Sequence, residues 1–296
     1  MKSIILFNFL FIFWVIVGTA QSDSVSDDLS FYSDIVANAD LHSSKIRAND
    51  SLVVLVEKVL ENNQSKKLSN HKWISEVAPD DGTFKIFSWQ TQVSDSAFIY
   101  NAYISYENGS YVALQDKASK LYDDYEYMAG NKDNWFGQLY YNIIPFKLDE
   151  ETCYLLFGYN GWNQFENIKI AEVLSFDENG NPTFGQPLFV KEGQVERDAK
   201  QRIMLQYSDS SPVNLNYNPG LEMVVFDHLI SRMGTIPGQG PTSVSDGSYE
   251  GYKFEKGKWQ HVEKLYDHIY EEAPRPTPVL DSKEKNIFGE GKKIKN

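Results

Sequence analysis

Asp227 and His228 are the neighbouring residues with the clearest potential for acid–base chemistry. The imidazole of a histidine titrates near neutral pH, and a carboxylate can orient it. Adjacent residues on a strand point to opposite faces, however, so these two side chains would not meet on an extended segment. No Gly-x-Ser-x-Gly elbow supplies a nucleophile, and the single cysteine, Cys153, lies inside an apolar run. The sequence therefore favours a structural aspartate and a half-buried histidine, and it assigns no catalytic residue.

A loop rich in oxygen side chains resembles a calcium-binding loop in part. Asp177, Asn179 and Asn181 alternate as calcium ligands do, but the glycine stands at the fourth position and no glutamate occupies the twelfth. Clusters of Asp, Asn and Gly are also what tight hairpins need. We therefore interpret this segment as a turn, with calcium binding as the weaker alternative.

A zinc site would need histidine and acidic residues at a spacing that brings their side chains together, and the region near the C-terminal end is a candidate for this. His261, His268 and Glu272 would share a broad face if residues 261–272 formed a helix. The His-Glu-x-x-His motif is absent from the chain. We expect neither a metal ion nor another cofactor.

An acidic and aromatic run is the better candidate for a recognition surface. Rings and carboxylates follow one another over residues 122–127, and residues 155–162 end in a further tryptophan. The predicted binding residues are Tyr122, Asp123, Asp124, Tyr125, Tyr127 and Trp162. A solvated amphipathic segment would have the same composition. Carboxylates are also numerous enough for a glycosidase pair, but the sequence cannot place two of them at the required separation.

The overall charge and composition narrow the range of partners. A formal net charge of −13 argues against nucleic acid, which is bound largely through Lys and Arg, and against anionic lipid surfaces. Such acidity suits a protein that meets cations or a basic partner. Aromatic residues make up 14% of the chain, which favours sheets and also supplies rings for binding sugars or proteins.

The first twenty residues have the pattern of a secretory signal peptide. Lys2 precedes an apolar run from Ile4 to Val17, and Gly18-Thr19-Ala20 ends in small residues suited to cleavage after Ala20. The run is short for a membrane span, which needs about 20 apolar residues. We predict an exported protein of the periplasm, the outer membrane or the exterior, with no integral span after processing. An uncleaved anchor is the alternative.

The next segment, residues 21–82, has helical periodicity. Leu52, Val53, Val56, Val59 and Leu60 recur three and four residues apart, which predicts a helix packed on the sheet. Residues 49–51 can cap its start, and residues 29–39 form a shorter helix before it.

From residue 83 to residue 272 the pattern changes to short strands and tight turns. Asn108-Gly109 is the strongest hairpin signal, because both residues tolerate positive φ angles. Two further hairpins are predicted, one over residues 168–190 and one over residues 249–262. Other strand-like runs occupy residues 84–90, 138–146, 153–157, 202–207, 213–217 and 221–226.

About a dozen such strands predict an α+β fold of predominantly antiparallel β structure, arranged as a sandwich, barrel or meander, with N-terminal helices. Residues 273–296 are expected to be a proline-rich linker and a polar, lysine-rich tail.

Several blocks together resemble a family of exported proteins of Bacteroidetes-type bacteria. The resemblance spans about residues 84–262 and is carried by the segments 135–141, 155–162, 179–189, 224–229 and 247–259. No activity is established for that family, so the resemblance implies export and an intact fold but no catalytic residue. Residues 234–245 form an unusual Gly-, Pro- and Ser-rich connection in this chain.

We therefore expect a cell-envelope protein whose β-rich module binds another protein or a glycan, or forms part of an envelope assembly, without catalysis. The alternative is a hydrolase acting on envelope polysaccharide or peptide.

Overall fold

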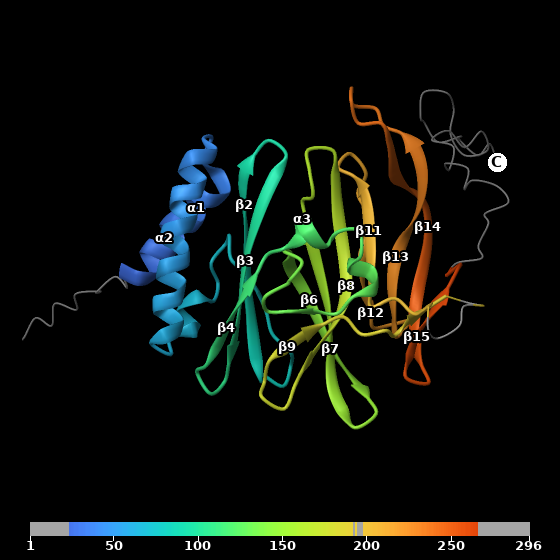
Figure 1. Ribbon diagram of the computed structural model, residues 1–296, viewed down its shortest axis with the longest axis horizontal. Coiled ribbons are helices and arrows are strands. Elements are labelled where there is room, and N and C mark those ends of the chain that lie inside the picture. Colours follow the sequence, from blue (N-terminus) through green and yellow to red (C-terminus); the bar gives the residue numbers. More distant parts are fainter. Residues whose placement is uncertain (1–23, 192, 194–197, 266–296) are drawn as a thin grey trace, which may run out of the picture.

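The computed structural model describes residues 24–191, 193 and 198–265, and its elements form four layers in succession (Figure 1). The predicted signal peptide and the linker and tail of residues 273–296 lie outside the described residues. The predicted α+β class, mostly antiparallel β with N-terminal helices, is confirmed. Among the described residues no helix has both the length and the apolar character needed to cross a membrane.

Two helices form the first layer. Helix α1 (Ser24–Asn38) and helix α2 (His42–Glu61) turn their apolar faces toward strands β2 (Phe84–Ser94) and β3 (Ala97–Tyr106). Leu52, Val56 and Leu60 are buried in this contact, as the helical periodicity predicts. The start of α2 was wrongly predicted, because the helix begins at His42 and residues 49–51 lie in its interior.

Asn49 is buried where helix α2 packs on strands β2 and β3. Its Oδ1 accepts hydrogen bonds from Trp89 Nε1 at 2.8 Å, Thr91 Oγ1 at 2.8 Å and Asn101 Nδ2 at 2.9 Å. The residue is 4% exposed, so water cannot replace these bonds easily.

Replacing Asn49 with alanine should therefore lower the free energy of unfolding by about 1–3 kcal/mol, because buried donors lose their acceptor. Urea denaturation measures this change. Asn38→Ala is the control, since the side chain of Asn38 bonds to Asp34 at an exposed position. Equal effects of the two substitutions would contradict a special role for Asn49.

The first sheet has the order β1-β2-β3-β4, with β1 (Ser75–Val77) and β4 (Tyr111–Gln115) at its edges. The β3–β4 hairpin turns at Asn108-Gly109, as predicted, and Gly109 has a φ of +87°. A glycine adopts this angle without steric cost, which explains the strength of the sequence signal.

The central sheet contains β6 (Leu139–Leu148), β7 (Glu151–Asn160) and β8 (Glu166–Phe176) in antiparallel order. Its remaining strands pair with one another or with β8 and are β5 (Gly130–Asn131), β9 (Pro182–Phe184) and β11 (Arg202–Ser208). Strand β7 is buried on both faces: Cys153, Leu155 and Phe157 contact one core, whereas Tyr154 and Leu156 contact the other. This explains why β7 reads as a continuous apolar run.

The third sheet has the order β10-β15-β14-β13-β12. Its strands are β10 (Phe189–Val190), β12 (Leu215–Asn218), β13 (Met223–Met233), β14 (Pro241–Glu255) and β15 (Lys258–Val262). The β14–β15 hairpin was predicted correctly. The hairpin over residues 168–190 was only partly right, because β8 pairs with β9 but β10 runs parallel to β15.

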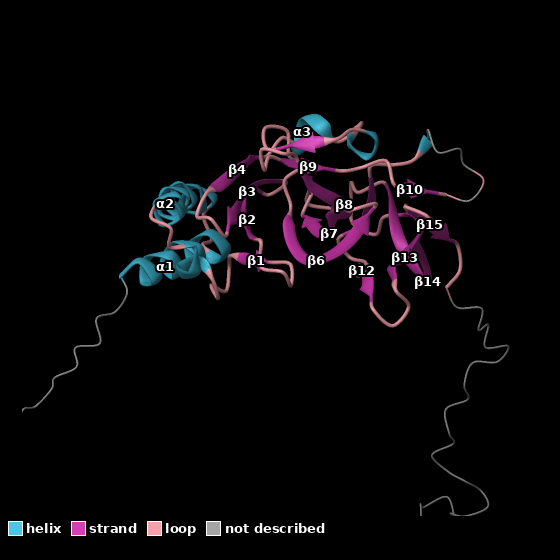
Figure 2. Cartoon of the chain, turned by 90° about the horizontal axis from the view of Figure 1, so that it is seen from below, coloured by secondary structure: helices cyan, strands magenta, loops and turns pink. Residues whose placement is uncertain are grey.

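The connection predicted for residues 234–245 is also shorter than expected. Strand β13 continues to Met233 and β14 begins at Pro241, so these two strands extend together as a ribbon. One hydrophobic core lies between the first and central sheets, and another lies between the central and third sheets. The sheets are therefore stacked as layers, and Figure 2 shows them following one another from the helices to β14.

The first sheet covers only part of one face of the central sheet, and a separate segment covers a further part of that face. It contains helix α3 (Ala118–Leu121) and the short helix η2 (Tyr125–Tyr127). Ala118 and Tyr125 pack on Ile168 and Ile170 of β8 in a small core of their own. We call residues 116–128 the cap segment.

Candidate functional site

Three cavities border the cap segment, and one of them also borders the third sheet. The first, of about 450 Å³, is bordered by Trp162, and the second, of about 270 Å³, is bordered by Tyr122. The third, of about 230 Å³, contains His228, and Glu126 and Met204 border both the second and the third. Tyr122 of the second cavity stacks on Trp162 of the first, so the two rings lie between these cavities. We call the three cavities together the β11 groove.

A column of stacked groups runs from the protein interior to this groove. The guanidinium carbon of Arg202 lies 3.4 Å from the ring centroid of Tyr125, which stacks on Phe136 at 4.7 Å. Phe136 stacks on Trp162 at 6.1 Å, and Trp162 stacks on Tyr122 at 4.5 Å. The inner end is fully buried, whereas Trp162 and Tyr122 are half-buried. The buried part of the column thus fixes the positions of the Trp162 and Tyr122 rings.

Two charged side chains, one on β11 and one just before it, fix the cap segment to the central sheet. Arg202 donates hydrogen bonds to the carbonyl oxygens of Met128 at 2.7 Å and Phe184 at 3.0 Å. Lys200 Nζ lies 2.6 Å from Glu126 Oε1. These contacts hold η2 against β11, and they set the position of the groove wall.

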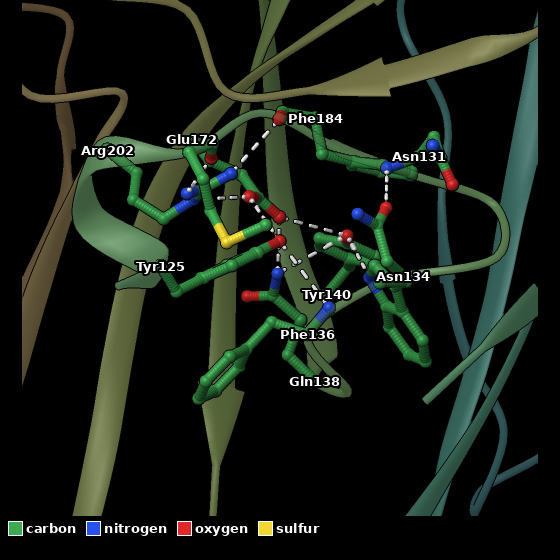
Figure 3. A network of polar contacts seen from close by, with 11 residues as sticks. Tyr125, Asn131, Asn134, Phe136, Gln138, Tyr140, Glu172, Phe184 and Arg202 are labelled. Carbon is green, nitrogen blue, oxygen red and sulfur yellow. Dashed lines mark hydrogen bonds and ion pairs between the residues drawn. The ribbon is translucent and has the colours of Figure 1, made fainter. Parts of the chain in front are cut away.

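Glu172 of β8 is the partner of Arg202 in a fully buried network (Figure 3). Arg202 Nε donates to Glu172 Oε2 at 2.9 Å, and Tyr125 donates to the same oxygen at 3.1 Å. Tyr140 and Gln138 donate to the other carboxylate oxygen. Burial raises the pKa of both tyrosines, and the nearby carboxylate raises it further, so both hydroxyls keep their protons as donors.

Carboxylates surround the outer ring of the column. The hydroxyl of Tyr122 donates to Gln206 Oε1, and Gln206 donates to Glu166. Burial raises the pKa of Tyr122, and the charges of Glu166, Asp123 and Glu126 raise it further. The second cavity therefore combines an aromatic ring with a negative field, which is an arrangement that attracts cations.

A carboxylate joins two histidines in the third cavity. Glu250 of β14 accepts a hydrogen bond from His228 Nδ1 through one oxygen and from His261 Nε2, at 2.8 Å, through the other. His228 lies opposite an irregularity in β14, where the register shifts between Asp227 and Leu229. Asp246 in this irregularity lies 4.0 Å from His228. The extra residues in β14 thus bring Asp246 near the imidazole that the paired residue Glu250 already contacts.

Asp227 and His228 do not pair with each other, as their adjacent positions on a strand predict. Asp227 instead accepts hydrogen bonds from the backbone N–H of Asn214 at 2.6 Å and from Ser245 Oγ at 2.8 Å. The two side chains have different partners, as expected for neighbours on a strand. Cys153 is buried in the core, away from these groups.

The predicted binding residues divide into three groups. Tyr122, Asp123 and Trp162 border the groove, whereas Tyr125 is fully buried and cannot contact a ligand. Tyr125 was therefore wrongly assigned to the surface, and its role is to support the rings above it. Two others are exposed but do not line the groove cavities: Asp124 and Tyr127. The ring of Tyr127 has Lys200 Nζ 5.8 Å from its centroid.

The loop considered for calcium is a turn that uses its own carboxylate. Asp177 Oδ1 accepts the backbone N–H groups of Asn179 at 2.9 Å and Asn181 at 2.8 Å. The side chain of Asn181 donates to the other oxygen of Asp177. In the part of the chain that the structure describes, no group of three or more His, Cys, Asp or Glu residues could hold a metal ion.

The zinc hypothesis depended on a helix over residues 261–272. His261 lies on strand β15, so its neighbours do not follow helical geometry. His268 and Glu272 lie outside the described residues.

Glu250 and Met204 are groove residues that sequence reasoning did not identify. Glu250 lies 22 positions from His228, and no local motif links them. Its only signal is the glycine-flanked sequence around it, which also fits an ordinary hairpin.

Comparisons with protein-family models, with curated proteins and with solved structures gave no match to this chain. The resemblance to exported proteins of Bacteroidetes-type bacteria therefore stays a prediction from the sequence.

Proposed function

We propose that this protein is an exported, non-enzymatic binding module of the cell envelope that captures a basic segment of a partner protein in the β11 groove. The N-terminal sequence pattern supports export, and the resemblance to exported bacterial proteins agrees with it.

The observation that carries this proposal is the ring of Tyr122 surrounded by carboxylates. A lysine or arginine side chain over such a ring gains a cation–π interaction, and Asp123 offers it an ion pair. Arg202 already makes such a contact with Tyr125 at the inner end of the column. A net charge of −13 would also accelerate encounter with a basic partner.

Replacing Tyr122 with alanine is expected to weaken binding of a lysine-rich peptide about tenfold, because the ring and part of the stack are lost. Asp123→Asn should weaken it about threefold and reduce its dependence on salt. Fluorescence anisotropy with a labelled peptide, measured at two salt concentrations, gives both values.

Phe31→Ala and Asp133→Asn are the matched controls, since both residues are exposed and neither lines the groove. Affinities unchanged by Tyr122→Ala, or weakened equally by Phe31→Ala, would contradict the proposal. Retention of a neutral glycan but not of the peptide would replace the protein partner by a sugar.

A hydrolase is the second candidate, and it is favoured by the joint contact of His228 and His261 with Glu250 in a cavity. Such a group could transfer protons during cleavage of polysaccharide or peptide. The residues that line the third cavity include no serine, threonine or cysteine, so the attacking group would be water or, on a polysaccharide, a carboxylate such as Glu250. Turnover of envelope polysaccharide that is lost in Glu250→Gln would establish this function in place of binding.

A further inference from the structure

Strand β11 has one paired side and one open side. It pairs antiparallel with β8 over its whole length, and no other strand of the described residues pairs with it. At its start the backbone N–H of Gln201 donates to the carbonyl of Glu126 at 2.7 Å. At its end Gln239 donates to Ser208 Oγ at 2.9 Å. The open stretch therefore lies between these two contacts, at residues 203–206.

The second and third cavities lie on opposite faces of this stretch. Met204 and Gln206 stand opposite Ile170 and Ile168 of β8 and border the cavity that contains Tyr122. Ile203 and Leu205 point to the other face and border the cavity that contains Glu250. Met204 borders both cavities, so the edge of β11 separates them.

We propose that the partner segment binds as an added strand along β11, with alternate side chains entering the two cavities. This inference rests on the proposed function and names how the ligand is held. An unpaired strand edge offers backbone N–H and C=O groups to an extended chain, while side-chain pockets on either face supply selectivity.

The two cavities select different side chains. On the Tyr122 face, the exposed carboxylate of Asp123 favours lysine or arginine, whereas Glu126 is already paired with Lys200. On the other face, Leu205, Phe226 and Tyr252 provide apolar and aromatic contacts beside Glu250, His228 and Lys200, which also line this cavity. The expected ligand is thus a polypeptide in which basic and apolar residues alternate.

A polypeptide fits this arrangement better than a glycan. A sugar chain has no amide groups to continue a β ladder, and it would gain nothing from the open edge of β11.

The test uses the full chain and a labelled peptide of alternating lysine and valine, with N-methyl groups placed on every second amide in two complementary sets. An added strand turns only alternate amides toward β11. One methylated set should therefore weaken binding more than about tenfold, and the complementary set less than about twofold. Amide hydrogen exchange of residues 203–206 should slow when the unmodified peptide binds.

Equal effects of the two methylated sets, or unchanged exchange in β11, would overturn strand addition. If Tyr122→Ala still weakens binding of the peptide in that case, the site for basic side chains is supported and only strand addition is contradicted. If the unmodified peptide does not bind, both proposals fail. Binding of a neutral oligosaccharide with protection of Trp162 instead would also overturn the inference.

Discussion

Replacing Arg202 with methionine is expected to lower the free energy of unfolding by about 3–5 kcal/mol. The side chains of Arg202 and Glu172 are both 0% exposed, so the substitution leaves a carboxylate in the core without its cation. Tyr125, Tyr140 and Gln138 would still donate to Glu172, but these neutral donors cannot replace the lost charge. Urea denaturation followed by tryptophan fluorescence measures the change.

The exposed pair of Lys132 and Asp133 provides the control. Asp133→Asn should change stability by less than about 0.5 kcal/mol, because surface ion pairs contribute little. Glu172→Gln combined with Arg202→Met should cost less than the two single substitutions added together, since no unpaired charge is left. Strict additivity would contradict direct coupling of the pair.

Gly185→Ala is expected to destabilise the protein by about 3 kcal/mol. Gly185 has a φ of +87°, which disfavours any residue with a Cβ. A Cβ at this position would also overlap the Nη2 of Arg202. That nitrogen donates to the carbonyl oxygen of Phe184, and the Nε of the same guanidinium donates to Glu172. The backbone and the buried pair therefore both resist the substitution.

Gly180→Ala separates these two causes. Gly180 has a φ of +78°, but no atom lies within 4 Å of the position of its added Cβ. We expect a loss of about 1 kcal/mol there, from the backbone alone. Equal losses at both glycines, measured by the same urea titrations, would show that contact with Arg202 adds nothing.

Local signals were enough to predict much of the fold. Asn108-Gly109 located the β3–β4 hairpin, and the spacing of Leu52, Val56 and Leu60 located α2 and its buried face. The position of β10 could not be predicted in the same way. Its parallel pairing with β15 joins Phe189 to Trp259, and such distant pairing leaves no local pattern.

The candidate site was predicted only where its residues are close in sequence. Tyr122 and Asp123 belong to one conspicuous run, but their contacts with Trp162 and Gln206 depend on the arrangement of separate elements. Tyr125 has the same composition around it and is nevertheless buried, because the cap segment turns it toward Glu172. Sequence pattern alone does not distinguish these two tyrosines.

The burial of β7 on both faces has a consequence for how the molecule opens. The helix layer and the third sheet each have one neighbouring layer, so either can separate while the remainder stays assembled. The core between the central and third sheets includes the thiol of Cys153. Its rate of alkylation therefore reports how often that outer sheet detaches, and the backbone amides of β7 should be the last to exchange with deuterium.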